Sequence, residues 1–124
     1  MRLLLDTQVL LWWRDDSPQL SARARAEIAD ATNEILVSTA TLWEIVIKRG
    51  LRKLSFPDDL EDVVREESFE LMPISFRHLR RLETLPELHR DPFDRMLVAQ
   101  TLTEGVSLVT NDRALLAYGV PALW

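Results

Sequence analysis

Short apolar runs alternate along the chain with longer segments whose apolar residues recur at helical spacing. Three runs, at residues 3–5, 35–38 and 107–110, are predominantly apolar without strict alternation, which is typical of strands covered on both faces of a parallel sheet. A fourth strand is predicted within residues 69–74. It contains Pro73, which lacks a backbone donor and predicts a short strand or one at the edge of the sheet.

Helices are predicted between the strands. Ser21 and Asp91 are suitable N-caps, Pro92 fits a first helical turn, and Gly50 is a typical C-terminal stop. The last apolar segment, residues 120–124, receives no element. The predicted helices cover residues 7–14, 22–31, 39–49, 57–67, 75–84 and 92–104, with a short helical turn at 113–117.

This alternation of strands and helices predicts an α/β fold with a parallel sheet covered by helices on both faces. No internal repeat, linker or low-complexity tract interrupts the chain. A single domain over residues 1–124 is therefore predicted, a length that suits one hydrophobic core.

Composition narrows the classes of function. The 124 residues are 47% hydrophobic with a net charge of −5, which argues against a nucleic-acid coating protein but not against an enzyme that holds nucleic acid through a cation. The lack of cysteine excludes disulfides and thiolate metal sites. With no signal-peptide pattern and no apolar run long enough to span a bilayer, we expect a cytoplasmic protein without a membrane segment.

Three aspartates stand where functional groups are expected. Asp6 comes directly after the first predicted strand and Asp112 just past the last, and ligands of open parallel sheets bind beyond the carboxyl ends of strands. Either side chain can alternatively cap the helix that follows it. Asp94 lies in the first turn of the helix that Asp91 caps, near the positive end of the helix dipole, and helix stabilisation alone would explain both residues.

Glu44 stands inside a mostly apolar helical run, residues 42–47. Two interpretations are open. Glu44 can form a surface ion pair with Lys48 one turn later, with Thr41 on the same face. Alternatively, it is a partly buried carboxylate near the end of the sheet, which requires a cation or a network of donors because an unpaired buried charge is costly.

The four acids lie on separate predicted elements and can converge on one pocket. Carboxylates gathered in this way repel one another unless a cation lies between them. Oxygen donors, without cysteine and with only two histidines, favour Mg²⁺ or Mn²⁺ over zinc. Such an ion binds phosphate oxygens and can orient or activate a water, so the chemistry indicated is phosphodiester hydrolysis. The candidate ligands are Asp6, Glu44, Asp94 and Asp112.

Other side chains are weaker candidates. His78 and His89 match no metal-ligand pattern and are interpreted as surface or loop histidines. The four tryptophans stand among aliphatic residues, where core packing or a subunit interface is favoured over base stacking. No nucleophile-elbow, P-loop or dinucleotide-binding motif is present.

These acids and their surroundings resemble those of PIN-domain proteins, specifically VapC-type toxin ribonucleases of bacterial toxin–antitoxin pairs. The resemblance covers nearly the whole chain and implies a three-layer α/β/α sandwich with metal-dependent endoribonuclease activity. Each matching segment is weak evidence alone, but all of them in this order are strong evidence. The segments are Leu4–Thr7, Leu11–Trp13, Val37–Ser38, Leu42–Ile45, Asp91–Arg95 and Val109–Asp112.

The resemblance also implies roles for individual residues and partners. Thr7 would hold the first carboxylate or a water on the metal, Asn111 is a candidate helper, and Asp91 belongs to the motif but is interpreted as a cap. The implied partners are an RNA substrate, an antitoxin that inserts a segment into the acidic cleft, and a second copy of the chain in a homodimer. The family's catalytic and metal-binding acids match Asp6, Glu44, Asp94 and Asp112.

Two other functions stay open. A PIN-like module that binds a partner or RNA without cleavage would be favoured by loss of pocket acids, yet all four are present. A haloacid-dehalogenase-type phosphatase needs a second aspartate two residues after the first, where this chain has Gln8. Five lysines and arginines are candidates for contacts with phosphate, although the favoured interpretation is that they are ordinary solvated surface residues. They are Arg49, Arg52, Lys53, Arg90 and Arg95.

Overall fold

Five parallel strands form the central sheet of the computed structural model, which describes all residues 1–124. Their order is β3-β2-β1-β4-β5, so the first strand lies in the middle. Leu4 pairs in register with Leu36 on one side and with Leu108 on the other. The strands are β1 (Arg2–Leu5), β2 (Glu34–Ser38), β3 (Glu70–Met72), β4 (Ser107–Val109) and β5 (Ala122–Leu123).

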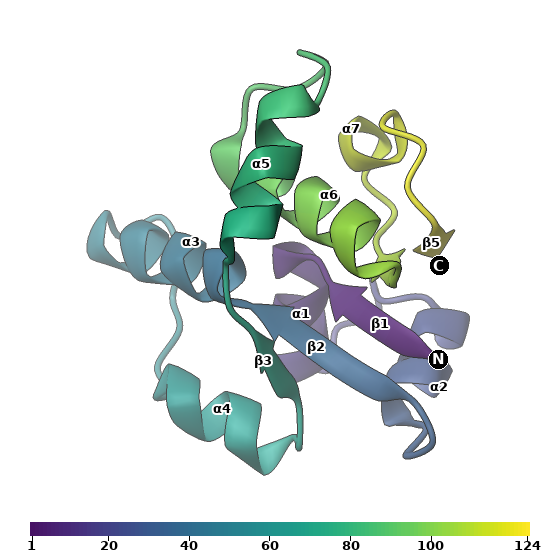
Figure 1. Cartoon of the computed structure of the whole chain (residues 1–124). Coiled ribbons are helices and arrows are strands. Elements are labelled where there is room, and N and C mark those ends of the chain that lie inside the picture. Colours follow the sequence, from purple (N-terminus) through teal and green to yellow (C-terminus); the bar gives the residue numbers. More distant parts are fainter.

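Seven helices connect the strands and lie on both faces of the sheet (Figure 1). This arrangement confirms the predicted α/β/α sandwich. No helix is both long and apolar enough to cross a membrane. The helices are α1 (Thr7–Arg14), α2 (Ala22–Ala29), α3 (Thr39–Gly50), α4 (Leu60–Glu66), α5 (Phe76–Thr84), α6 (Pro92–Glu104) and α7 (Arg113–Leu116).

Alternate residues of the inner strands point into two separate apolar cores. Leu3 and Leu5 belong to the core that includes residues of α1, α2 and α4, whereas Leu4 belongs to the core that includes residues of α6 and α7. All three leucines are fully buried, and each such burial contributes about 2 kcal/mol. Because both faces of the sheet are covered, the buried residues 3–5 of β1 and 35–37 of β2 are apolar on both faces.

Two helix boundaries differ from the prediction by more than one residue. Helix α4 begins at Leu60 rather than Pro57, because the carboxylate of Asp59 accepts a backbone N–H from its first turn and acts as the N-cap. Helix α2 ends at Ala29, two residues earlier than predicted. The side chain of Asp30 instead binds the backbone two residues further on and closes a turn, an alternative that short polar side chains offer to the helix.

Three further predictions are corrected, for the end of α3, for the end of β4 and for the final apolar segment. Gly50 is the last residue of α3 rather than a stop after it, and the left-handed conformation falls on Arg52 with a φ of 56°. Strand β4 ends at Val109, one residue short of the prediction. The final apolar segment forms β5, which pairs with β4 at the sheet edge. Strand β3 has three residues and lies at the other edge, as predicted.

The interpretation of His78 as a surface or loop histidine is wrong. Its side chain lies in α5 and is 2% exposed. Its Nδ1 accepts the backbone N–H of Ser75 at 3.0 Å, and its Nε2 lies 2.7 Å from a carboxylate oxygen of Glu104. A neutral ring with its proton on Nε2 satisfies both contacts. His78 therefore joins the start of α5 to the end of α6.

Three of the four tryptophans pack as predicted. Trp12 and Trp13 contact the core on the α1 side, and Trp124 packs on Trp12 with ring centroids 5.9 Å apart. Trp43 lies outside the core, because it is 57% exposed and meets Phe93 edge to face, so for this residue the subunit-interface alternative stays a prediction.

We expect His78→Ala to destabilise the protein by about 3 kcal/mol, because it removes a buried ring together with its contacts to both helices. Arg80→Ala, at an exposed position of the same helix, is the matched control and should change stability by less than about 0.5 kcal/mol. Urea denaturation followed by circular dichroism measures both. Equal midpoints for the two variants would contradict the proposed bridge between α5 and α6.

Candidate active site

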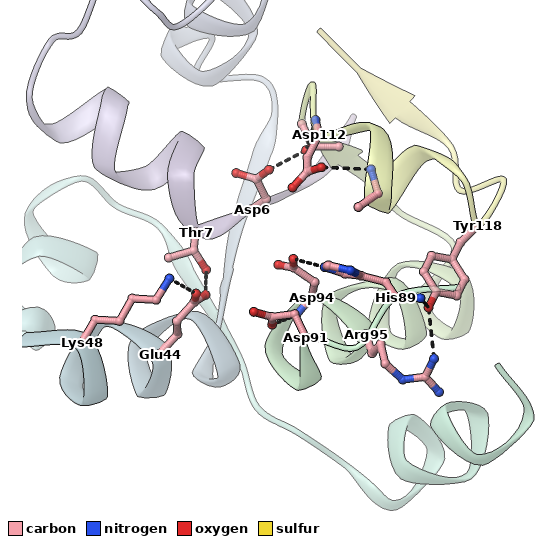
Figure 2. Close-up of polar contacts among 12 residues, drawn as sticks. Asp6, Thr7, Glu44, Lys48, His89, Asp91, Asp94, Arg95, Asp112 and Tyr118 are labelled. Atoms are coloured by element: carbon pink, nitrogen blue, oxygen red, sulfur yellow. Dashed lines mark hydrogen bonds and ion pairs between the residues drawn. The ribbon is translucent and has the colours of Figure 1, made fainter. Parts of the chain in front are cut away.

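A hollow lies at the carboxyl edge of the sheet, where Asp6 follows β1 and Asp112 lies just beyond β4. These neighbouring strands flank the point where the strand order reverses, which is where open α/β sheets bind ligands. Figure 2 shows the acidic side chains gathered around one space. This acidic pocket is lined by five carboxylates and two lysines, together with four other residues. The charged lining residues are Asp6, Glu44, Asp91, Asp94, Asp112, Lys48 and Lys53.

Asp6 is both a helix cap and a pocket residue. It is 5% exposed, and its carboxylate accepts the backbone N–H of Val9 at 2.7 Å and the hydroxyl of Thr110. Burial is the main cause that raises its pKa from 3.8 to about 6, with smaller contributions from the charges of Asp94 and Asp112. The two hydrogen bonds only partly offset this rise.

Asp91 and Asp94 have different contacts at the start of α6. Asp91 is the N-cap, as predicted, and accepts the backbone N–H of Asp94 at 2.9 Å. The Asp94 carboxylate accepts a hydrogen bond from Nε2 of His89 at 2.9 Å (Figure 2). Burial raises the pKa of Asp94, and the charges of Asp91 and Glu44 raise it further against the opposing effect of His89.

Asp112 caps α7 by accepting the backbone N–H of Ala114 at 2.9 Å, and it lines the acidic pocket as well. For Asp6 and Asp112, capping and pocket placement were alternatives in the sequence, and the structure combines them. Asn111 is exposed and is not among the residues that line the pocket.

The structure combines parts of both interpretations of Glu44: the ion pair with Lys48 forms, but Glu44 is buried and not at the surface. The residue is 4% exposed and lines the pocket, yet one carboxylate oxygen lies 2.6 Å from Nζ of Lys48. The other oxygen accepts the hydroxyl of Thr7 at 2.7 Å (Figure 2), and that hydroxyl also contacts Thr41. The predicted network of donors therefore exists, and it compensates the burial of this charge.

Two features of the pocket were not predicted from the sequence. His89 lies in a loop, as predicted, but its ring reaches Asp94 five residues later. Lys48 was recognised as a partner of Glu44 and not as part of the pocket wall. The only sequence signal for either contact was the short spacing to the neighbouring acid.

The pocket's donors suit a hard divalent cation, although no group of three or more acidic or histidine side chains is arranged to hold a metal ion as these side chains stand. All the carboxylate donors are oxygens, which Mg²⁺ and Mn²⁺ prefer. Burial raises the pKa of Asp6 and of Asp94, and neighbouring carboxylates raise both further, so added positive charge would favour their ionised forms. A divalent ion would supply that charge.

The structure thus defines an α/β domain with an acidic site at the carboxyl edge of a parallel sheet. The family model of the PIN domain matches residues 3–120. The chain therefore belongs to the PIN-domain family, which confirms the resemblance noted in its sequence.

Several solved structures share this fold at low sequence identity. DNA-bound VapBC from Salmonella typhimurium is 19% identical, covers 99% of this chain and 97% of its own, and gives a TM-score of 0.70. VapBC2 from Rickettsia felis, bound to a promoter DNA fragment, is 16% identical over 99% and 98%, with a TM-score of 0.69. FitAcB from Neisseria gonorrhoeae is 16% identical over 98% and 96%, also with a TM-score of 0.69. Comparison with curated proteins gives no significant match.

Stability without metal should depend on pH through Asp6. Because its folded pKa of about 6 exceeds the ordinary 3.8, its contribution to stability is fully present below about pH 4 and is lost as the pH rises through 6. The loss amounts to about 3 kcal/mol. Asp6→Asn cannot ionise, so in chelator it should gain stability over the wild type at pH 7 and lose that advantage near pH 4.

Denaturant unfolding at the two pH values measures this difference. Asp59→Asn changes an N-cap that lies outside the acidic pocket, so it should show no such gain at pH 7. A difference between Asp6→Asn and wild type that stays constant with pH would contradict the assignment.

Proposed function

We propose that this chain is a metal-dependent endoribonuclease that hydrolyses RNA phosphodiester bonds and acts as the toxin of a toxin–antitoxin pair. The observation that carries the proposal is the convergence of Asp6, Glu44, Asp94 and Asp112 on one pocket at the carboxyl edge of the sheet. Crowded carboxylates destabilise a fold unless they serve a cation. Membership of the PIN family and the fold shared with VapBC structures support the same function.

Asp6, Asp94 and Asp112 would hold Mg²⁺ or Mn²⁺, with Glu44 as the fourth carboxylate. When bound, the ion would supply Lewis-acid activation of water and neutralise the charge that builds on the phosphate. Thr7 supports the site by binding Glu44, and Asn111 stays a candidate helper because it adjoins Asp112.

The chain's own contribution to catalysis is positioning. The bonds from Val9 and Thr110 restrain the Asp6 carboxylate, and the bond from His89 restrains that of Asp94. Side chains restrained in this way lose little freedom when substrate and cation bind, so less of the binding energy is consumed in ordering them.

A PIN-like module that binds without cleavage is the second candidate. The observation that favours it is the state of Glu44, whose two oxygens are already occupied by Lys48 and Thr7. Cleavage assays separate the two functions.

Cleavage is tested with total RNA and random single-stranded RNA in Mg²⁺ or Mn²⁺. The wild type should cut, whereas Asp94→Asn and Asp6→Asn should each lose at least about 100-fold in rate, because each removes a negatively charged ligand. Chelator should abolish activity. Asp59→Asn, the cap outside the pocket, should retain it.

Circular dichroism spectra like that of the wild type would show that the inactive variants are folded. Undiminished cleavage in chelator or in both pocket variants would overturn the hydrolytic mechanism. Metal-independent RNA binding by a wild type that never cleaves would favour the binding module.

The proposed partners are an antitoxin and a second copy of the chain. The acidic pocket suits a cationic segment of an antitoxin. Helix α3 also carries apolar side chains on one exposed stripe at helical spacing, which supports a protein interface. This α3 stripe comprises Trp43, Val46, Ile47 and Leu51, which are 37–60% exposed.

If the α3 stripe forms a homodimer, light scattering should give twice the chain mass of 14.4 kDa. Val46→Glu places a charge in the stripe and should weaken the dimer at least about tenfold, because the charge would be buried there without a partner. Leu88→Glu changes an exposed apolar residue in the loop after α5 and should leave the mass unchanged. A monomeric wild type would contradict the proposed dimer.

A further inference from the structure

Lysine is used in this chain only at the acidic pocket. The sequence has 13 arginines and two lysines, and Lys48 and Lys53 both line the pocket whereas no arginine does. The two lysines are joined through the backbone, because the N–H of Lys53 donates to the carbonyl of Lys48 at 2.9 Å. The end of α3 and the turn after it thus place two compact positive charges on one wall.

Lys48 is held in place by Glu44 and still has unused hydrogen-bond donors. Its Nζ lies 2.6 Å from Glu44, yet its side chain is 46% exposed. An ammonium group has three N–H donors, so two remain for a ligand while one binds Glu44. The hydrogen bond to Glu44 raises the pKa of Lys48, and the charges of Asp91 and Asp94 raise it further. The side chain is therefore positively charged at every pH at which the protein is expected to work.

The other candidate cations are placed differently. Arg49 donates to two backbone carbonyls in the segment before α4, and Arg95 donates to a backbone carbonyl and to Tyr118. Of the five residues considered as phosphate contacts from the sequence, only Lys53 lines the pocket. Lys48 was not among them.

We propose that Lys48 and Lys53 bind phosphate groups of the RNA on the α3 side of the acidic pocket. The class of ligand rests on the proposed ribonuclease function. Five carboxylates repel a polyanion, so a nucleic-acid strand needs fixed positive charge at the wall that it approaches. Glu44 holds Lys48 in position before RNA arrives, which lowers the entropic cost of forming the contact.

The test measures RNA binding in the Asp94→Asn background with Mg²⁺, so that hydrolysis does not interfere. The probe is a short fluorescein-labelled single-stranded RNA of random sequence, followed by fluorescence anisotropy across a range of salt concentrations. A plot of the logarithm of the association constant against the logarithm of the salt concentration has a negative slope. Each lost phosphate contact should reduce the magnitude of that slope by about 0.7. The same relation predicts binding about fivefold weaker at 0.1 M salt than in the parent protein, with the difference vanishing near 1 M.

Lys48→Met and Lys53→Met should each show this loss, and Lys48→Arg should restore the slope because it keeps the charge. Arg52→Gln removes an exposed charge next to Lys53 that does not line the pocket, and it should keep the parent slope. Lys53 is exposed, so Lys53→Met tests the proposal even if Lys48→Met unfolds after Glu44 loses its partner.

Parent-like slopes in every folded lysine-to-methionine variant would overturn the proposal, as would an equal loss in Arg52→Gln or an absence of RNA binding by the parent. The outcome is separable from that of the cleavage assay. If the wild type cleaves RNA but the slopes do not change, only the lysine contacts fail. If the slopes fall but the wild type cleaves nothing, only the hydrolytic function fails.

Discussion

Helix capping is the interaction on which the acidic pocket depends. Asp6, Asp91 and Asp112 each accept a backbone N–H at the start of a helix, and each also lines the pocket. A cap of this kind contributes about 1 kcal/mol and restrains the carboxylate that provides it. The helices α1, α6 and α7 therefore start where the site needs negative charge. The same aspartate side chains stabilise the helix starts and shape the pocket.

Gathering carboxylates in one pocket is electrostatically unfavourable, and the effect is largest at Asp6 and Asp94. Both are partly or fully buried among other carboxylates, and their pKa values are raised as a result. Glu44 avoids an unpaired charge by binding Lys48 and Thr7, and Asp94 is partly compensated by His89. The pocket thus contains one carboxylate, Glu44, that is paired with a cation, whereas Asp6 and Asp112 accept hydrogen bonds only from neutral groups.

Much of the fold was predictable because its signals are local. Continuous apolar runs indicated buried parallel strands, and Asp91-Pro92 marked the start of α6. The errors arose where tertiary contacts outweigh local preference. Strand β5 has only two residues and exists because β4 offers it an edge, and His78 is buried because Ser75 and Glu104 satisfy both of its ring nitrogens. The Ser75 contact is a local capping box, but Glu104 lies 26 residues further along the chain and is not evident from sequence spacing.

For the site, the sequence by itself determined which acids were available and that Asp6 and Asp112 each follow a predicted strand, whereas the pairing of those two strands came from the fold. The sequence left capping and pocket placement as alternatives, because a carboxylate at a helix start serves either purpose. Only the tertiary structure decided that the capping aspartates do both, that Glu44 is at once buried and paired, and that the two lysines stand on the pocket wall. The physical reason is that these outcomes depend on distances between α1, α3, α6 and α7, which are set by packing on the sheet and not by the residues adjacent in the chain.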